Sequence, residues 1–454
     1  MIKLKEIAWK RRISLQGETL QHVKKLDQWQ WLSHEQMEEL QKRWLTSLLR
    51  HAYEHCSYYR KILTEAQAVL PDGTVLLEHF RQIPLLERET FHPHFEELKS
   101  DDFHHRKWYL NWSGGSTGEP IRLLQDRRYF NWNQAVKIQY DQWSGKGLVD
   151  RQIVLWGSER DLMVGHETWK TYMGRWMRNE RWFNTRYMSP KHMKAYVEEW
   201  NQYRPVQILT YAESIYELAR FIEENNLYIY PPKSIMTTAS VLHPHMRTVV
   251  ERVFQTTVFN RYGSREIGAI ACECEHHSGL HISAPTHYVE ILDTNGNPIE
   301  PGVQGELVIT SLHNYTMPII RYRIGDTATW ATQPCSCGRQ LPMLKEIGGR
   351  VTDLFVRRDG GLVDGRLFIL LLGTLPFIKK FQVYQGDFDT LTISIILKEQ
   401  VEHPELLYQA ELQMIREKSR ALIGDDCQIV IRFVDDIPAT ASGKYRYTIS
   451  AIKR

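Results

Sequence analysis

The sequence lacks an apolar run long enough to cross a bilayer. The longest, Leu367 to Ile378, is interrupted by Gly373 and Pro376, whereas a transmembrane helix needs about 20 consecutive apolar residues. The amino terminus has charged residues after Trp9 and does not have the apolar core of a signal peptide. We therefore expect a cytoplasmic protein without a membrane span.

A strong net charge is also absent. The 454 residues carry a formal charge of only +3, with basic and acidic residues interspersed, which argues against nucleic acid as a partner. A basic cluster near the amino terminus is interpreted as a solvated helix face, with contact to a membrane surface as the alternative; it comprises Lys3, Lys5, Lys10, Arg11 and Arg12. The length exceeds what a single hydrophobic core fills, so we expect two or more domains.

Cysteines are few, and four of the six lie in two close pairs, Cys272 with Cys274 and Cys335 with Cys337. In a cytosolic chain of this length, paired cysteines indicate a metal site rather than disulfides. Four protein ligands leave no open position for water, so the predicted site is structural rather than catalytic.

The spacing of these residues fits tetrahedral coordination of zinc by three cysteines and one histidine. Two residues separate Cys274 from the histidine, and a Cys-x-Cys knuckle follows later. The predicted ligands are Cys274, His277, Cys335 and Cys337. Three further residues compete closely for the ligand positions: Cys272, His276 and His281.

Helix and strand patterns divide the chain into a large and a small part. Ser33 and Gln36 form a capping box before a run with helical spacing. Between about residues 105 and 330, short apolar runs such as 153–156 and 206–209 alternate with amphipathic ones. This alternation predicts a largely parallel sheet with helices on its faces. From about residue 288 the pattern changes to strands and turns, which predicts a β-rich subdomain over about residues 270–345.

The segment Gly348-Gly349-Arg350 is the candidate boundary between the two parts. After it, strand-like runs at 381–384 and 391–397 precede a predicted helix over 404–422 and a last strand at 428–434; Pro404 suits a first helical turn. We therefore predict an α/β amino-terminal domain of residues 1–350, with mostly parallel sheets and the β-rich subdomain. A small, mobile α+β domain of residues 351–454 follows it.

A loop rich in glycine and hydroxyl residues, Asn111 to Pro120, follows the strand-like run 108–110. Glycine lets several backbone N–H groups turn toward one anion, and the hydroxyl groups add donors, so the loop suits a polyphosphate. It lacks the Gly-Lys-Ser/Thr ending of the common nucleotide loop. Alone, such a loop is more often an ordinary turn.

Four further segments place charged or aromatic residues beside turns: residues 261–266, 321–326, 349–353 and 437–444. Each has a simple alternative explanation, with Glu266 as a surface carboxylate, Asp326 as a turn residue and Lys444 as a solvated side chain. Five such segments in this order, with these separations, are hard to reach by chance.

Together, these segments resemble those of adenylate-forming enzymes, specifically the phenylacetate–coenzyme A ligase family and its relatives found with capsular-polysaccharide genes. The resemblance runs from about residue 30 to the end. The Tyr-Gly-Ser-Arg-Glu form of residues 262–266 is similar to the capsule-associated branch and differs from the Tyr-Gly-x-Thr-Glu of the wider superfamily. The resemblance implies that ATP activates a carboxylic acid as an acyl-adenylate, with release of pyrophosphate, and that the acyl group then goes to the thiol of coenzyme A.

The resemblance also implies how ATP is bound. Its β- and γ-phosphates would lie in the loop formed by Ser113, Gly114, Gly115, Ser116, Thr117 and Gly118. Adenine would stack on Tyr262, in the segment Arg261, Tyr262, Gly263 and Ser264. Glu266 would bind Mg²⁺, and Asp326 would hold the ribose hydroxyls with help from Arg350. Lys444 would move in with the small domain and stabilise the charge of the first transition state.

The sequence departs from the family pattern at three positions. Thr352 occupies the usual pivot between the domains, where relatives often carry a charged residue. Glu119 replaces the lysine that many relatives place just before the proline of the phosphate loop. In the adenine-side segment, which includes Ala239, Ser240 replaces the common glutamate.

Two other functions stay open. The acyl group could go instead to an amine or hydroxyl of a sugar or amino acid, or to a carrier-protein thiol, in polysaccharide biosynthesis. A non-catalytic protein that uses the fold only for binding is the third reading, and the presence of both Glu266 and Lys444 argues against it.

The identity of the acid is open, because Trp156 and Tyr211 could flank an aryl ring or simply pack in the core. The oligomeric state is open too, with a homodimer common among relatives.

Overall fold

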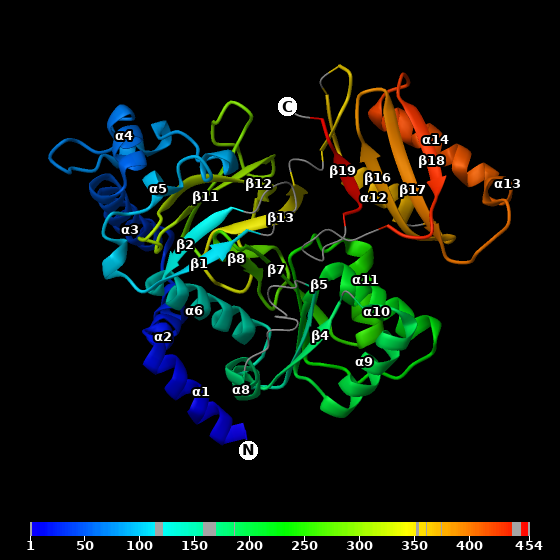
Figure 1. The fold of residues 1–454 in the computed structure, drawn as a ribbon, viewed down its shortest axis with the longest axis horizontal. Helices are drawn as coiled ribbons and strands as arrows, with labels where there is room; N and C mark the ends of the chain where they lie inside the picture. Colours follow the sequence, from blue (N-terminus) through cyan, green and yellow to red (C-terminus); the bar gives the residue numbers. More distant parts are fainter. Residues whose placement is uncertain are drawn as a thin grey trace. The chain divides into compact units, whose positions relative to one another are not determined.

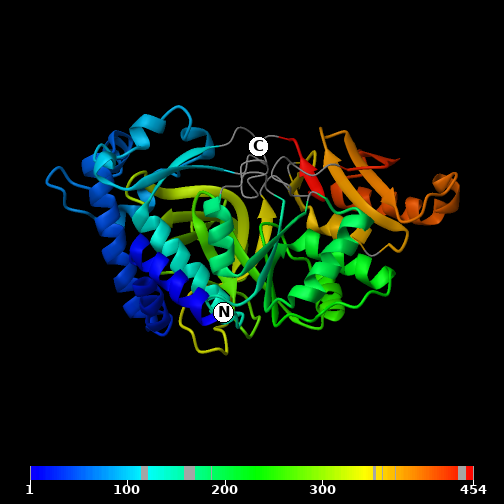
Figure 2. The ribbon, with the colours of Figure 1, turned by 60° about the horizontal axis from the view of Figure 1, so that its bottom comes forward.

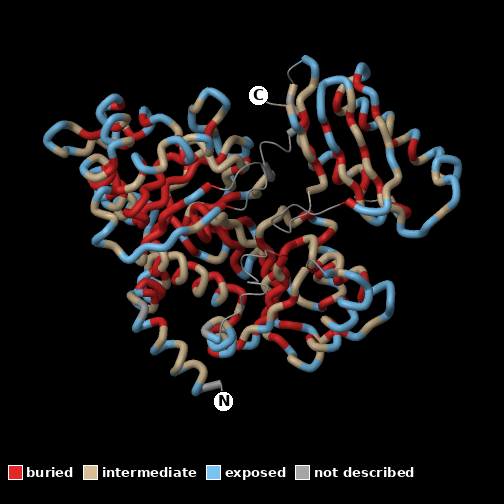
Figure 3. The backbone as a smooth tube through the Cα atoms, viewed as in Figure 1, coloured by how far each residue is buried: buried red, intermediate tan, exposed pale blue. Residues whose placement is uncertain are grey.

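The computed structural model describes residues 2–113, 121–157, 169–185, 187–350, 354–359, 361–373, 375–437 and 446–452. These residues fall into two compact units, one up to Gly348 and one from Gly349 onward, and each has its own buried interior (Figure 3). Within these ranges, no helix is both long and apolar enough to cross a membrane. The predicted fold class, a large α/β part with a β-rich region and a smaller α+β part, is confirmed.

The first unit is built on an 11-stranded sheet with the strand order β10-β11-β12-β13-β9-β8-β7-β6-β5-β3-β4 (Figure 1). The half from β4 to β7 is parallel. Its strands are β3 (Gln152–Trp156), β4 (Glu180–Asn184), β5 (Gln207–Tyr211), β6 (Ser234–Thr238) and β7 (Thr257–Ser264).

Beyond β7 the sheet becomes antiparallel, beginning with the pairing of β7 with β8. The strands of this half are β8 (Gly268–Glu273), β9 (Leu280–Ile282), β10 (His287–Leu292), β11 (Gln304–Ser311), β12 (Ile319–Trp330) and β13 (Met343–Arg350). The β-rich residues therefore continue the parallel sheet, and β7 is the strand that both halves share.

Helices cover both faces of the parallel half. One face, with Ile153, Ile208 and Ile235, packs against α9 (Pro190–Tyr203), α10 (Ala212–Glu224) and α11 (Pro244–Phe254). The other face, with Leu209 and Met236, packs against α6 (Arg127–Trp143) and is called here the α6 face. Adjacent residues such as Ile208 and Leu209 belong to different cores because successive strand side chains point to opposite faces.

The amino-terminal helices surround these elements. They are α1 (Ile2–Gln16), α2 (Thr19–Trp29), α3 (His34–His55), α4 (Ser57–Glu65) and the short α5 (Phe95–Leu98). Helix α2 runs alongside α6, as Figure 2 shows, and α1 contacts α8 (Trp169–Arg178). The predicted capping box of α3 is confirmed: the Ser33 hydroxyl accepts a hydrogen bond from the N–H of Gln36, whose side chain accepts one from the N–H of Ser33.

The second unit has a four-stranded sheet with the order β18-β17-β16-β19 and a two-stranded sheet of β14 and β15. Its elements are β14 (Leu354–Val356), β15 (Leu362–Asp364), α12 (Arg366–Gly373), β16 (Ile378–Gln385), β17 (Thr390–Leu397), α13 (Pro404–Leu407), α14 (Gln409–Ile423), β18 (Gln428–Phe433) and β19 (Thr448–Ser450). The single helix predicted over 404–422 is divided at Tyr408, whose φ of −108° is not helical and whose ring stacks on Phe377 at 4.1 Å.

Two buried histidines of the first unit stack on Trp132 of α6. The ring centroids are 3.8 Å apart for His22 and Trp132 and 4.5 Å apart for Trp132 and His313, with nearly parallel planes. Burial, together with the positive charges of Lys25 and Arg128, lowers the pKa of His22 to about 4. Burial also holds the pKa of His313 well below its usual range. Both rings are therefore neutral at pH 7, and protonating either one opposes folding.

We expect acid to destabilise the first unit through this stack. In the unfolded chain a histidine binds its proton near pH 6.5, whereas folded His22 does so only near pH 4. The free energy of unfolding therefore falls as the pH is lowered from about 6.5 toward 4. The variant His22→Phe keeps a ring on Trp132 but cannot titrate, so its unfolding in denaturant should depend less on pH. His34→Phe, at an exposed histidine of α3, is the matched control. An identical pH dependence in His22→Phe and the parent protein would contradict the assignment.

Candidate active site

Strand β7 brings the central predicted segment to the carboxyl end of the parallel half, where α/β sheets bind their ligands. Its Gly263 permits a close approach to β8, because a Cβ at this position would lie 2.4 Å from the carbonyl oxygen of Gly268. The turn that follows is held by Ser264, whose hydroxyl accepts a hydrogen bond from the N–H of Ile267 at 3.1 Å. Glu266 is therefore placed by a turn that only glycine at position 263 allows.

The hairpin of β1 (Trp108–Trp112) and β2 (Arg122–Asp126) holds the same turn from the other side. The side-chain amides of Asn111 and Gln125 donate to the carbonyl oxygen of Arg265 at 3.2 and 2.9 Å. Gln125 also donates to the carbonyl oxygen of Glu266 at 3.2 Å. Because β1 and β2 flank the predicted phosphate loop, these bonds fix the base of that loop relative to Glu266.

Arg88, in the short 3-10 helix η2 (Arg88–Thr90), joins the base of the loop to Glu266. Its guanidinium donates to the Ser113 hydroxyl at 3.1 Å and lies 3.6 Å from a carboxylate oxygen of Glu266. Ser113 is fully buried, and its hydroxyl also accepts the N–H of Ile121 at 2.8 Å. The rest of the predicted loop, Gly114, Gly115, Ser116, Thr117 and Gly118, lies outside the described residues. Sequence analysis did not single out Arg88, and no local pattern around it indicates this role.

The residues predicted for adenine and ribose lie next to each other. The Tyr262 hydroxyl donates to a carboxylate oxygen of Asp326 at 2.5 Å, although the two residues are 64 positions apart. Both side chains are half-buried, whereas Glu266 is only 8% exposed. Tyr262, Glu266 and Asp326 thus belong to one region of the first unit.

The predicted adenine-side segment also reaches the carboxyl end of the sheet. Ala239 has a φ of +71°, a conformation that is uncommon for a residue with a side chain. The hydroxyl of Ser240 donates to a carboxylate oxygen of Glu213, in the first turn of α10. A carboxylate is therefore present beside position 240, although it comes from another element. Nearby on β3 and β5, the rings of Trp156 and Tyr211 are 4.6 Å apart.

One predicted residue, Arg261, lies apart from this group, and two others, Arg350 and Lys444, have side chains outside the described ones. Arg261 precedes Tyr262 in β7 but lines a cavity beneath α6. Arg350 is the last residue of β13, and its side chain is not among the described ones. Lys444 also lies outside the described residues.

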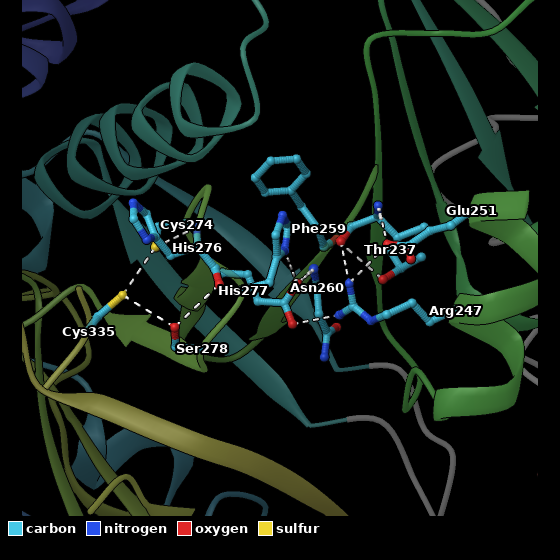
Figure 4. A network of polar contacts seen from close by, with 12 residues as sticks. Thr237, Arg247, Glu251, Phe259, Asn260, Cys274, His276, His277, Ser278 and Cys335 are labelled. Carbon is cyan, nitrogen blue, oxygen red and sulfur yellow. Dashed lines mark hydrogen bonds and ion pairs between the residues drawn. The ribbon is translucent and has the colours of Figure 1, made fainter. Parts of the chain in front are cut away.

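Among the described residues, the group that could hold a metal ion includes His281, one of the competing histidines, and not His277. The potential ligand atoms of Cys274, His281, Cys335 and Cys337 all lie within 4.8 Å of one another. The His277 ring packs against Phe259 at 4.6 Å (Figure 4), and its Nδ1 is 3.1 Å from a carboxylate oxygen of Glu273.

Strand pairing explains why His281 lies in this group. His281 of β9 lies opposite Cys272 of β8, and side chains at alternate positions of a strand share a face, so Cys274 projects toward the same side as His281. The Sγ atoms of Cys274 and Cys335 are 3.6 Å apart, and Cys337 Sγ is 3.3 Å from His281 Nε2. Backbone N–H groups two residues on donate to the sulfurs of Cys274 and Cys337, each at 3.4 Å. This donor set is suited to a tetrahedral metal ion.

Known proteins are similar to this chain in sequence and in fold. Residues 355–451 match the family model described as the CapK C-terminal domain. Protein CapK of Staphylococcus aureus is 26% identical over 269 residues, which cover 58% of this chain and 57% of that protein. Phenylacetate-coenzyme A ligase of Thermus thermophilus is 22% identical over 452 residues, which cover 93% of this chain and 98% of that enzyme. The chain is similar in sequence to phenylacetate–coenzyme A ligases over most of its length.

Solved structures agree with this resemblance at the level of the fold. The 2-hydroxyisobutyryl-CoA ligase in its postadenylation state, in complex with 2-HIB-AMP, has a TM-score of 0.70 and 19% identity. The match covers 92% of this chain and 90% of that ligase. The anthranilate CoA ligase AuaEII in complex with anthranoyl-AMP matches 74% of this chain with a TM-score of 0.54 and 14% identity. The chain thus has the fold of these ligases.

Proposed function

We propose that the chain uses ATP to convert a carboxylic acid into an acyl-adenylate, with release of pyrophosphate, and then transfers the acyl group to the thiol of coenzyme A. The observation that supports this most directly is the grouping of Ser113, Tyr262, Glu266 and Asp326 around the turn after β7. A hydroxyl donor, an aromatic ring and two carboxylates are the groups that a magnesium nucleotide requires. The similarity to phenylacetate-coenzyme A ligases over nearly the whole chain supports the same reaction.

Glu266 fits the requirements of the magnesium ion that accompanies ATP. Magnesium prefers oxygen ligands and is usually bound by one or two carboxylates together with substrate phosphates. The Glu266 carboxylate is nearly buried and lies beside the base of the predicted phosphate loop through Arg88 and Ser113. A bound ion would supply positive charge that offsets the repulsion between the acid and the phosphates.

The two steps of the proposed reaction indicate roles for the remaining residues. In the first step a carboxylate oxygen of the acid attacks the α-phosphorus, a new oxygen–phosphorus bond forms, and the bond to pyrophosphate breaks. Lys444 is proposed to bridge the acid and the α-phosphate during this step, while Arg88 positions Ser113. In the second step the thiol loses its proton to solvent, its sulfur attacks the carbonyl carbon, and AMP leaves. Tyr262 and Asp326 hold adenine and ribose throughout.

A second acceptor class is favoured by the small unit. Residues 355–451 match the CapK C-terminal domain, and Protein CapK is among the relatives. The alternative is that the same acyl-adenylate is transferred to an amine or hydroxyl of a sugar or amino acid, or to a carrier-protein thiol, in polysaccharide biosynthesis. Because adenylate formation is common to both, product analysis with each acceptor separates them.

Acid-dependent exchange of pyrophosphate into ATP tests the shared first step. With pooled carboxylic acids that include uronic and amino acids, we expect Glu266→Gln and Lys444→Ala each to lower exchange by about 10²–10³-fold. Glu266→Gln removes the negative charge proposed to hold magnesium, and Lys444→Ala removes the positive charge proposed to stabilise the transition state. Arg88→Met should raise the KM for ATP more than it lowers kcat, since Arg88 positions the loop. Glu65→Gln and Lys61→Ala, at exposed positions of α4, are the matched controls. Full exchange in Lys444→Ala would assign this role to another lysine or favour the non-catalytic reading.

We further propose that Cys274, His281, Cys335 and Cys337 bind a structural zinc ion. Zinc commonly takes three thiolates and one imidazole at the corners of a tetrahedron, and the four potential ligand atoms lie within 4.8 Å of one another. Two of the ligands belong to the β8–β9 hairpin, and the other two lie between β12 and β13. The ion would therefore tie the hairpin that follows Glu266 to the outer strands of the sheet.

Metal analysis of the purified chain should find about one zinc per molecule. His281→Ala should lose most of this metal and lower the thermal midpoint, because one ligand is removed from a closed site. His277→Ala is the matched control, since its ring contacts Glu273 and Phe259 instead, and it should retain the metal. Loss of zinc in His277→Ala but not in His281→Ala would overturn this ligand assignment.

A further inference from the structure

The first unit contains a cavity of about 440 Å³ between α6 and the α6 face of the parallel strands. Sites for small molecules typically have volumes of about 300–1,000 Å³, so the cavity is large enough for one. Helices α1, α2 and α6 and strands β3, β4, β5 and β7 all contribute to its wall. We call it the α6 cavity.

Strand register shows how the α6 cavity lies in the sheet. Gln152 and Glu180, in the first pair of β3 and β4, line its end at the amino edge. Leu209 of β5 lies in the middle of the strands, and Arg261 lies just beyond the pair of Thr237 with Asn260, near the carboxyl edge. The five residues of β3, which run from the amino edge to the carboxyl edge, span about 13 Å along the strand.

The α6 cavity extends toward the carboxyl edge of the sheet, where the candidate active site lies. Arg261 follows Phe259 on one face of β7, and Phe259 pairs with Met236 of the α6 face. Trp156 and Tyr211, two positions beyond Val154 and Leu209, face the same side of the sheet as the cavity, at its carboxyl edge. Tyr262 is the next residue of β7 and faces the opposite side of the sheet.

The other end of the α6 cavity is positively charged. Five basic and two acidic side chains line the cavity as a whole, and Arg261 lies at the opposite end, which leaves Arg12, Lys137, Lys146 and Arg178 against Asp141 and Glu180. Lys146 pairs with Asp141 at 3.0 Å, and Arg178 pairs with Glu180 through two hydrogen bonds of 2.7 and 3.0 Å. Among the described residues, no carboxylate forms an ion pair with Arg12 of α1, so its charge is uncompensated there.

Arg12 and Arg178 approach each other at this end. A Cβ built on Gly174 of α8 would lie 3.7 Å from an Nη1 atom of each arginine, so the two guanidinium groups flank the same point. Glu180 offsets the charge of Arg178, so the two guanidinium groups beside one carboxylate keep a net positive charge, and arginine is well suited to bind carboxylate or phosphate. Between the charged end and Arg261, the wall is apolar or aromatic, with Phe130, Trp182 and Leu209.

We propose that the α6 cavity binds the acid substrate and that this acid carries a second anionic group at its far end. The reacting carboxylate lies at the end marked by Arg261, the apolar middle of the molecule lies along α6, and the second anion lies between Arg12 and Arg178. This inference rests on the proposed acid activation and adds the substrate class to it. A simple aryl or alkyl acid would leave the two arginines facing an apolar tail, which is unfavourable.

Matched pairs of acids test the proposal on the full-length chain. Each pair has the same length and skeleton, straight-chain or aromatic, and differs only in ending with a methyl group or a carboxylate. In pyrophosphate exchange, we expect kcat/KM for the dianionic member to exceed that for its partner by about tenfold or more, as charge-assisted hydrogen bonds allow. Arg12→Leu should lower kcat/KM for the dianionic acids more than for the monoanionic ones and so remove most of this preference. Arg11→Leu, at the exposed neighbouring position, should keep it.

A binding measurement separates failure of the proposal from failure of the reaction. Without ATP, the same dicarboxylic acids should raise the thermal midpoint of the parent protein and of Arg11→Leu, but not that of Arg12→Leu. If no acid supports exchange and this pattern still holds, the reaction assignment fails and the anion site stands. The proposal is overturned if the monoanionic acids are preferred, or if Arg12→Leu affects both members of each pair equally.

Discussion

The close approach of β7 and β8 at Gly263 is the constraint on which the candidate site depends. A side chain at this position would collide with the carbonyl oxygen of Gly268, so only glycine lets the two strands approach this closely where the sheet changes from parallel to antiparallel pairing. The turn that results places Glu266 against Arg88 and against the hairpin that flanks the phosphate loop. Strand β7 then serves two purposes, with Tyr262 in the nucleotide region and Arg261 in the wall of the α6 cavity.

Strand β8 links this turn to the Cys/His cluster. It begins two residues after Glu266, and Cys274 follows its last residue. A metal ion held by Cys274, His281, Cys335 and Cys337 would therefore restrain the carboxyl end of β8, whose amino end follows the turn that carries Glu266. This gives the cluster a physical connection to the site without a catalytic role for the metal.

Features that depend on local pattern could be predicted from the sequence. The buried run 153–156 is β3, the capping box of Ser33 and Gln36 begins α3, and the β-rich residues form the antiparallel half of the sheet. Features that depend on register or distant contacts could not. His281 faces Cys274 only because β8 and β9 pair as they do, and Arg88 reaches Glu266 across 178 positions of sequence. Glu213 similarly supplies the carboxylate that Ser240 lacks. The cytoplasmic location and the homodimer stay predictions.

The most direct measurement is a crystal structure of the full-length chain with magnesium and a non-hydrolysable ATP analogue. The account predicts adenine against Tyr262, ribose hydroxyls on Asp326, and the β- and γ-phosphates between Ser113 and a magnesium ion bound by Glu266. A nucleotide bound elsewhere in the molecule, with the Arg88–Glu266 contact unchanged, would contradict it.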